Sequence, residues 1–227
     1  MGTHFKLLVF DWDGTLMDSE ARIVTCFSAA IADMGAPPPP DALIRDIIGL
    51  ALPQAVQRLM PDADRALQRR VMDRYRHHYL YASQIPSQLF PGAADTVYDL
   101  RQQGYLLAVA TGKGRHGLDR ALEETGCTDM FHATRCADET VSKPHPQMLL
   151  ELMDELEAEP WNTLMIGDTE YDMRMAQNAG TAALAVSYGV HAPQRLLQCG
   201  ALACVDNIDE IKAWLQIRAA SNQFIQV

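Results

Sequence analysis

The feature that most constrains the fold is a short apolar run, Phe5 to Phe10, that ends abruptly in acidic residues. An almost unbroken run of this length predicts a strand buried on both faces of a parallel sheet. Asp11, Asp13 and Gly14 follow it, and this turn chemistry places two carboxylates and free backbone N–H groups at the carboxyl end of the strand. Ligands bind at that end in open α/β sheets. Such a turn can also simply end a strand, so its meaning depends on the rest of the chain.

Short apolar runs alternate with helical patterns from residue 90 onward. We expect strands over residues 105–110, 130–134, 163–166, 182–186 and 203–205. Helical patterns separate them, with one ending at residue 104 and others over 117–125, 147–158, 173–179, up to residue 199, and 208–217. Strands that alternate with helices predict the α/β class and a doubly wound parallel sheet.

Residues 17–89 interrupt this alternation directly after the first strand. We expect helices over residues 21–34, 41–48, 53–60 and 62–85 and no strand. Four consecutive prolines, Pro37 to Pro40, cannot continue a helix and mark a loop between the first two. We therefore interpret residues 17–89 as an inserted all-helical cap domain and residues 1–16 and 90–227 as the α/β core.

Composition narrows the function classes. The 227 residues carry 19 basic and 29 acidic side chains, a net charge of −10, with no basic stripe, so we expect no nucleic-acid partner. An anionic substrate would need a metal ion or a local lysine. Five scattered cysteines without C-x-x-C spacing argue against a disulfide framework or a zinc site. With no segment suited to a signal peptide or a membrane span, we expect a cytoplasmic protein with no membrane partner.

Three further polar motifs stand at or near the ends of the expected strands. They are Thr111-Gly112-Lys113, Ser142-Lys143-Pro144, and Gly167-Asp168-Thr169 with Asp172 close behind. Each motif alone has an ordinary structural explanation: a threonine after a strand often caps a helix, a lysine before proline is usually exposed, and Gly-Asp-Thr is common in turns.

Taken together and in this order, the four motifs resemble those of the haloacid dehalogenase-like hydrolase superfamily. More narrowly, the chain looks like the capped phosphatases of the phosphoglycolate phosphatase type, with a Rossmann-like core. The resemblance covers almost the whole chain, including Phe90-Pro91-Gly92, Lys143-Pro144-His145-Pro146 and the stretch from Gly167 to Met173.

The electrostatics favour the same reading. Asp11, Asp13, Asp168 and Asp172 would converge on one crevice, and a phosphate monoester adds about two more negative charges. Two like charges about 4 Å apart repel by roughly 4 kcal/mol at an effective dielectric constant near 20. Such a cluster needs a hard divalent cation, and Mg²⁺ bound by carboxylates and substrate phosphate suits it. Lys143 would add positive charge.

The resemblance implies a role for each motif residue. Asp11 is the expected nucleophile and Asp13 the general acid and base. The expected magnesium ligands are the carboxylates of Asp11 and Asp168 and the backbone carbonyl of Asp13. Asp172 would orient the metal site or Lys143 from outside the ligand set. The phosphoryl group would be bound by Thr111, Gly112 and Lys143, with backbone N–H groups near Trp12, Asp13 and Gly112.

Substrate selection is expected from the cap. Its stretch from Arg45 to Leu52 includes Gly49 and Leu50, which fall where family members carry a specificity loop, although Gly49 could equally just end a helix. We expect Trp161 and Trp214 in the core, while Trp12 is a candidate to line the phosphate site.

The function expected from this resemblance is Mg²⁺-dependent hydrolysis of a small phosphomonoester through an aspartyl-phosphate, with 2-phosphoglycolate as the first candidate substrate. Dehalogenases of the superfamily lack an acid at the position of Asp13, so its presence favours phosphoryl transfer. A phosphosugar mutase of the β-phosphoglucomutase type shares every motif and stays open. A non-catalytic phospho-acceptor module is a second alternative, and both a monomer and a homodimer remain possible.

Overall fold

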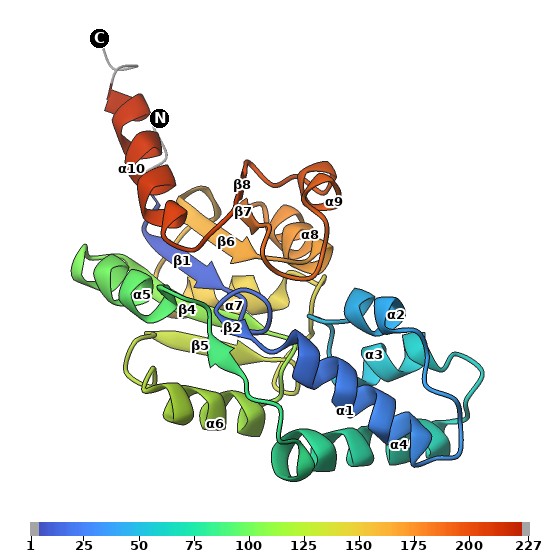
Figure 1. Ribbon diagram of the computed structural model, residues 1–227. Helices are drawn as coiled ribbons and strands as arrows, with labels where there is room; N and C mark the ends of the chain where they lie inside the picture. The colour runs from blue at the N-terminus through green and yellow to red at the C-terminus, as the bar shows by residue number, and fades with distance from the viewer. Residues whose placement is uncertain (1–4, 224–227) are drawn as a thin grey trace.

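The computed structural model describes residues 5–223, and its centre is a six-stranded parallel sheet of order β5-β4-β1-β6-β7-β8 (Figure 1). The first strand pairs with β4 on one side and β6 on the other, with Leu7 opposite both Leu106 and Thr163. The expected α/β class with a parallel sheet is therefore confirmed. The strands are β1 (Leu7–Phe10), β4 (Leu106–Thr111), β5 (Ala133–Cys136), β6 (Thr163–Gly167), β7 (Ala182–Val186) and β8 (Cys204–Val205).

Helices cover both faces of the sheet. Along β1, Leu8 and Phe10 face one hydrophobic cluster while Leu7 and Val9 face the other, as the two-residue period of a strand requires. A strand buried on both faces reads as a continuous apolar run, which explains the sequence of this segment. The helices are α5 (Ala93–Gln102), α6 (Arg115–Thr125), α7 (Gln147–Glu155), α8 (Glu170–Ala179), α9 (Pro193–Gln198), α10 (Glu210–Gln223) and the 3₁₀ turn η2 (Pro160–Asn162).

Residues 20–82 are helical and extend from the carboxyl edge of the sheet (Figure 1); we call them the helical segment. They bury a hydrophobic cluster of their own, built around Ile31, Ile44 and Val71. The expected helix over 62–85 is shorter, because the Asp64 carboxylate caps it by accepting from the Leu67 N–H at 2.7 Å, and its end widens into a π-helical turn. The elements are α1 (Glu20–Ala32), α2 (Asp41–Asp46), α3 (Leu52–Leu59), α4 (Arg65–His77) and η1 (His78–Ala82).

The expectation that residues 17–89 contain no strand is wrong. β2 (Met17–Asp18) and β3 (Gln88–Leu89) pair antiparallel, with Met17 opposite Leu89. Two-residue strands are too short to show a periodicity, so no sequence pattern predicts them. Their pairing holds the two ends of the helical segment together where the chain enters and leaves it.

Two further expectations need correction. The third strand begins at Ala133 rather than at residue 130, so β5 is displaced toward the C-terminus. Trp161 is 60% exposed instead of buried, because it lies in the η2 turn, whose Asn162 is the buried residue and accepts from the Glu159 N–H. Trp214 does pack on the core, with its ring stacked against Phe5. Among the described helices, none has the length and apolar character needed to cross a bilayer.

Candidate active site

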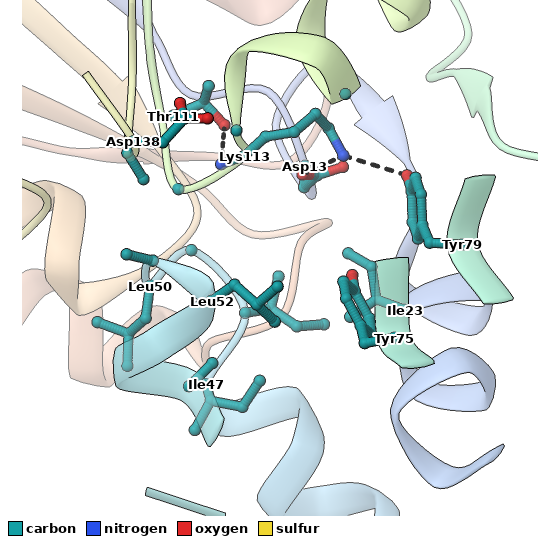
Figure 2. A pocket seen from close by; sticks show the side chains of 18 of the residues that line it. Asp13, Ile23, Ile47, Leu50, Leu52, Tyr75, Tyr79, Thr111, Lys113 and Asp138 are labelled. Carbon is teal, nitrogen blue, oxygen red and sulfur yellow. Dashed lines mark hydrogen bonds and ion pairs between the residues drawn. The ribbon is translucent and has the colours of Figure 1, made fainter. Parts of the chain in front are cut away.

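The sheet order gathers the motifs at one edge. Because β4 and β6 flank β1, their carboxyl ends place Thr111 and Asp168 on either side of Asp11. A cavity of about 260 Å³ lies between this edge and the helical segment (Figure 2). Asp11, Asp13 and Thr111 contribute to its lining from the sheet side. The site thus forms where open α/β sheets bind ligands.

Asp13 lines this cavity and is held by two side chains, Ser19 and Lys113. Its Oδ1 accepts from the Ser19 hydroxyl at 2.7 Å, and its Oδ2 lies 2.9 Å from Nζ of Lys113. Lys113 also donates to the Tyr79 hydroxyl at 3.1 Å, which links the site to η1 of the helical segment (Figure 2). Burial alone would lower the pKa of Lys113, but Asp13 and Tyr79 outweigh it and raise that pKa. Lys113 therefore stays charged.

Lys113 belongs to the second sequence motif, but its pairing with Asp13 was not predicted. Nothing in the sequence brings Tyr79 to Lys113, since the contact depends on how the helical segment packs on the core. The hydrogen bond from Ser19 to Asp13 was likewise not predicted. The surplus of carboxylates expected at this edge of the sheet could have indicated that Lys113 pairs with one of them.

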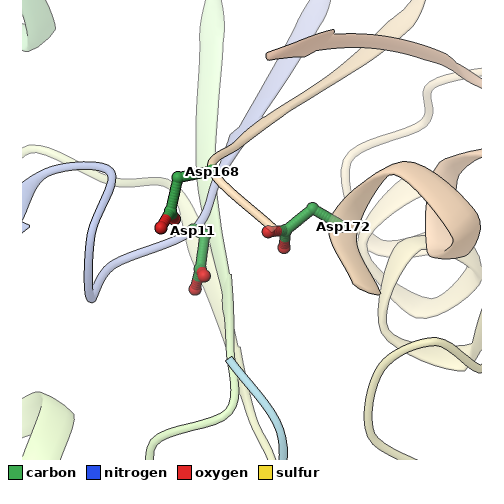
Figure 3. Close-up of side chains that lie close together, drawn as sticks. All are labelled: Asp11, Asp168 and Asp172. Atoms are coloured by element: carbon green, nitrogen blue, oxygen red, sulfur yellow. The ribbon is translucent and has the colours of Figure 1, made fainter. Parts of the chain in front are cut away.

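Asp11, Asp168 and Asp172 form a buried carboxylate cluster, in which one oxygen of each lies within 4.8 Å of the others (Figure 3). Burial is the largest effect on Asp168 and, with the charge of Asp172, raises its pKa to about 7. Burial likewise raises the pKa of Asp11, while Lys143 opposes the shift. Three carboxylates this close repel one another unless a cation lies among them.

The two oxygens of Asp11 differ. Oδ1 accepts from the Trp12 N–H at 2.7 Å and lies 2.7 Å from Nζ of Lys143. Oδ2 is buried and has no hydrogen-bond partner among residues 5–223. The Trp12 N–H, one of the backbone groups expected near the phosphate, donates to Asp11 in this structure. The Trp12 side chain is fully buried against Phe131, so it does not line the site.

Lys143 is fully buried behind Asp11 and is not part of the cavity lining. Its Nζ lies 2.7 Å from Asp11 and 2.6 Å from Asp172. Burial would lower the pKa of Lys143, but the two carboxylates outweigh it and the net shift is upward. Asp172 is fixed in turn by the Thr169 hydroxyl, which donates to its Oδ2 at 2.6 Å at the start of α8. Asp172 thus positions Lys143.

Asp168 is held from both sides, by the Thr15 hydroxyl at 2.8 Å and the Val190 N–H at 2.9 Å. Gly14 explains why this approach is possible. Its φ is +84°, and an added Cβ would lie 2.2 Å from Oδ2 of Asp168. The glycine of the first motif is therefore needed both for its backbone conformation and for the space that Asp168 occupies.

The loop between α2 and α3 approaches the second motif closely. An added Cβ on Gly112 would lie 2.4 Å from the Gly49 carbonyl oxygen, so only glycine allows this contact. Gly49 and Leu50, two expected specificity residues, line the cavity. Arg45, the third, is not among the lining residues and pairs with Glu20 on the surface. Arg45 and Glu20 are 25 residues apart in the sequence, so the sequence alone does not predict their contact.

A model of the haloacid dehalogenase-like hydrolase family matches residues 8–186, most of the chain. The chain belongs to this family. The match contains all of β1 except Leu7, together with the helical segment, β4, β6 and β7, and so includes all four motifs.

Curated relatives agree. The chain is 36% identical to "Probable phosphatase IndB" of Dickeya dadantii over 211 residues, 90% of this chain and 91% of the relative. It is 29% identical to a phosphoglycolate phosphatase of Haemophilus influenzae over 83% of this chain and 88% of that one. These matches confirm the expected enzyme class, a phosphatase.

A crystal structure described as a predicted phosphoglycolate phosphatase from Haemophilus somnus superposes with a TM-score of 0.82. The comparison covers 93% of this chain and 98% of the other, at 24% identity. At that identity the likeness shows the fold alone.

Proposed function

We propose that this phosphatase hydrolyses small phosphomonoesters with Mg²⁺ and an aspartyl-phosphate intermediate on Asp11. The observation that carries the proposal is the asymmetry of Asp11. Its Oδ1 is fixed by Trp12 and Lys143, while Oδ2 is buried, unpartnered among residues 5–223, and belongs to a residue that lines the cavity. A carboxylate oxygen left without a partner costs free energy unless a ligand or reaction uses it.

The residues present suit magnesium. The donors are carboxylate oxygens, which hard divalent cations prefer, and the raised pKa values of Asp11 and Asp168 reflect charges that a cation would stabilise. We assign the carboxylates of Asp11 and Asp168 and the backbone carbonyl of Asp13 as ligands. Asp172 is left outside this set, because Lys143 and Thr169 already engage both of its oxygens. When bound, the ion neutralises charge on the phosphoryl oxygens.

In the first step, Oδ2 of Asp11 forms a bond to phosphorus and the bond from phosphorus to the alcohol oxygen breaks. Asp13 gives its proton to the leaving alkoxide. In the resting site Nζ of Lys113 lies 2.9 Å from Asp13, and an entering phosphate offers that lysine a second anionic partner. The Thr111 hydroxyl, the Gly112 N–H and the charge of Lys143 are assigned to the phosphoryl oxygens.

In the second step, the Asp13 carboxylate takes a proton from water, and the water oxygen attacks phosphorus. The bond between phosphorus and Asp11 breaks, releasing inorganic phosphate and restoring the Asp11 carboxylate. Asp13 ends protonated, ready for the next leaving group. One residue thus serves as acid and then as base, which requires it to stay within reach of both oxygens.

The division of the chain is part of the proposal. We assign residues 1–16 and 90–227 to the core and 17–89 to a cap that excludes water and selects substrate. The hydrophobic cluster centred on the helical segment, which Tyr171 of α8 joins from the core, and the pairing of β2 with β3 at the base of the segment support this division. The five free cysteines support a reducing compartment, the cytoplasm, as the location.

The test is phosphate release from a panel of phosphomonoesters that includes 2-phosphoglycolate and several sugar phosphates, with Mg²⁺ and with EDTA. We expect turnover that requires the metal. An acid-labile, hydroxylamine-sensitive phosphoryl group on Asp11 without any turnover would favour the phosphosugar mutase or the phospho-acceptor module. Release that EDTA leaves unchanged would contradict the metal assignment.

A further inference from the structure

We infer that the substrate of this phosphatase is the phosphomonoester of an alcohol that carries an uncharged ring, rather than a small carboxylated alcohol such as glycolate. The inference rests on the proposed function and concerns the half of the cavity that receives the leaving group. It follows from three features of that half: its walls, its charges and one free hydroxyl.

The walls are apolar and come from three parts of the helical segment. Ile47, Leu50 and Leu52 stand on one side of the cavity, and Ile23 and Tyr75 stand opposite them (Figure 2). Apolar and aromatic walls of this kind stabilise a ring by removing its surface from water. A carboxylate placed there would lose its hydration without gaining a hydrogen-bond donor from these side chains.

The charges of the cavity also disfavour a second anion. Asp11, Asp13 and Asp138 all line it, and of the lining cations Lys113 is already paired with Asp13 at 2.9 Å. Arg76 is more than half exposed and pairs with its helix neighbour Asp73.

His116, the remaining basic side chain in the lining, is exposed. The carboxylate of 2-phosphoglycolate would therefore meet three acidic residues and find no buried cation free to pair with it among the residues that line the cavity.

One polar group in the wall is available to the substrate. The Tyr75 ring stacks on Phe27 with centroids 4.1 Å apart, which fixes its orientation. Its hydroxyl makes no hydrogen bond with any other described residue and faces the cavity toward the Asp13 side (Figure 2). Tyr75 can donate one hydrogen bond to a neutral oxygen or nitrogen on the ring, which gives orientation without requiring charge.

The experiment compares three esters that all leave as primary alkoxides: benzyl phosphate, ethyl phosphate and 2-phosphoglycolate, with wild-type protein and saturating Mg²⁺. A well-filled apolar pocket typically discriminates by about 10-fold or more for each missing hydrocarbon group. We expect kcat/KM for benzyl phosphate to exceed that for each of the other two esters by at least about 10-fold. A kcat/KM for 2-phosphoglycolate equal to or above that for benzyl phosphate would overturn the inference.

Leu52 offers a matched pair of variants, because it is only partly buried at the first turn of α3. Leu52→Arg adds a cation to the apolar wall, and we expect it to shift the ratio of the two kcat/KM values toward 2-phosphoglycolate by at least about 10-fold. Leu52→Met keeps the volume and should leave the ratio within about twofold. An unchanged ratio in a Leu52→Arg protein with wild-type melting temperature would mean that the leaving group does not bind here.

The two proposals fail in different ways. Hydrolysis of all three esters without a preference for the ring overturns this inference and leaves the proposed function standing. The absence of release from all three, and from the activated ester 4-nitrophenyl phosphate, would remove the proposed function itself.

Discussion

Replacing Lys143 by methionine should be among the most destabilising substitutions in the chain. The lysine is fully buried, and its Nζ lies 2.7 Å from Asp11 and 2.6 Å from Asp172. Removing one partner of a buried ionic group leaves uncompensated charge, which costs about 3–5 kcal/mol. For a chain of this size that corresponds to a fall in melting temperature of roughly 6–20 °C.

The loss should depend on pH. Burial already raises the pKa of Asp11 in the folded protein and Lys143 opposes that shift, so removing Lys143 raises this pKa further above its unfolded value. A carboxyl group with a raised folded pKa costs stability as pH rises, because the folded state then binds more protons than the unfolded state. The difference between Lys143→Met and wild type should therefore be largest at neutral pH and shrink as pH falls toward about 4, the ordinary pKa of these groups.

Urea unfolding in EDTA at pH 7.5 and pH 5 measures this directly, with an unchanged m value as the sign that only stability has moved. Lys212→Met is the matched control, because Lys212 pairs with Asp99 at 2.7 Å on the surface, where a pair is worth about 1 kcal/mol or less. Adding Asp172→Asn to Lys143→Met should restore part of the loss. Equal stability of the Lys143→Met and Lys212→Met proteins would refute the reasoning.

Four further outcomes follow from the site. Because the pKa of Asp168 is raised to about 7 by burial and Asp172, the apparent Kd for Mg²⁺ should rise about tenfold per pH unit below 7, measured by calorimetry. Through the same group, EDTA-treated protein should lose up to about 4 kcal/mol of stability as pH rises from 4 to 7. Gly14→Ala should abolish detectable Mg²⁺ binding and lower kcat at least about 100-fold, because its Cβ would overlap Asp168. Gly112→Ala should raise KM, since it would displace the loop at Gly49.

The glycine substitutions have a matched control in the chain. Gly35→Ala places alanine at a similar φ of +76° with no atom within 4 Å of the added Cβ, so it should keep full activity. Wild-type turnover in Gly14→Ala would contradict the packing against Asp168. An Mg²⁺ affinity that stays constant between pH 5.5 and 7 would contradict the involvement of a group with a pKa near 7. An unchanged KM in Gly112→Ala would show that the loop does not shape the substrate site.

The residues at the strand ends could be placed from the sequence because the physics that positions them is local. A buried apolar run ends where polar residues begin, and parallel strands share one carboxyl edge, so Asp11, Thr111 and Asp168 had to meet. Asp172 lies in the first turn of α8, which begins at Glu170, three residues before the helix that was expected over 173–179.

Contacts between distant elements could not be placed. The pairing of Lys113 with Tyr79 depends on the packing of η1 against the core, and the burial of Lys143 behind Asp11 depends on the path of the loop before α7. The exposure of Trp161 could not be predicted from its residue type, because a large apolar ring stays exposed when it lies in a turn at the surface. The apolar cavity wall of the helical segment could not be predicted either. The neighbours of each helix decide which of its faces turns inward.

The measurement that tests the central claim most directly is a burst experiment with Asp13→Asn and 4-nitrophenyl phosphate. This ester needs no acid for its leaving group, so Asp11 should still be phosphorylated, while water attack without a base should slow by about 10²–10⁴-fold. We predict a rapid release of one nitrophenolate per chain with a phosphoryl group trapped on Asp11, and no burst in Asp11→Asn. Steady wild-type turnover by Asp13→Asn, or phosphate trapped on another residue, would contradict the account.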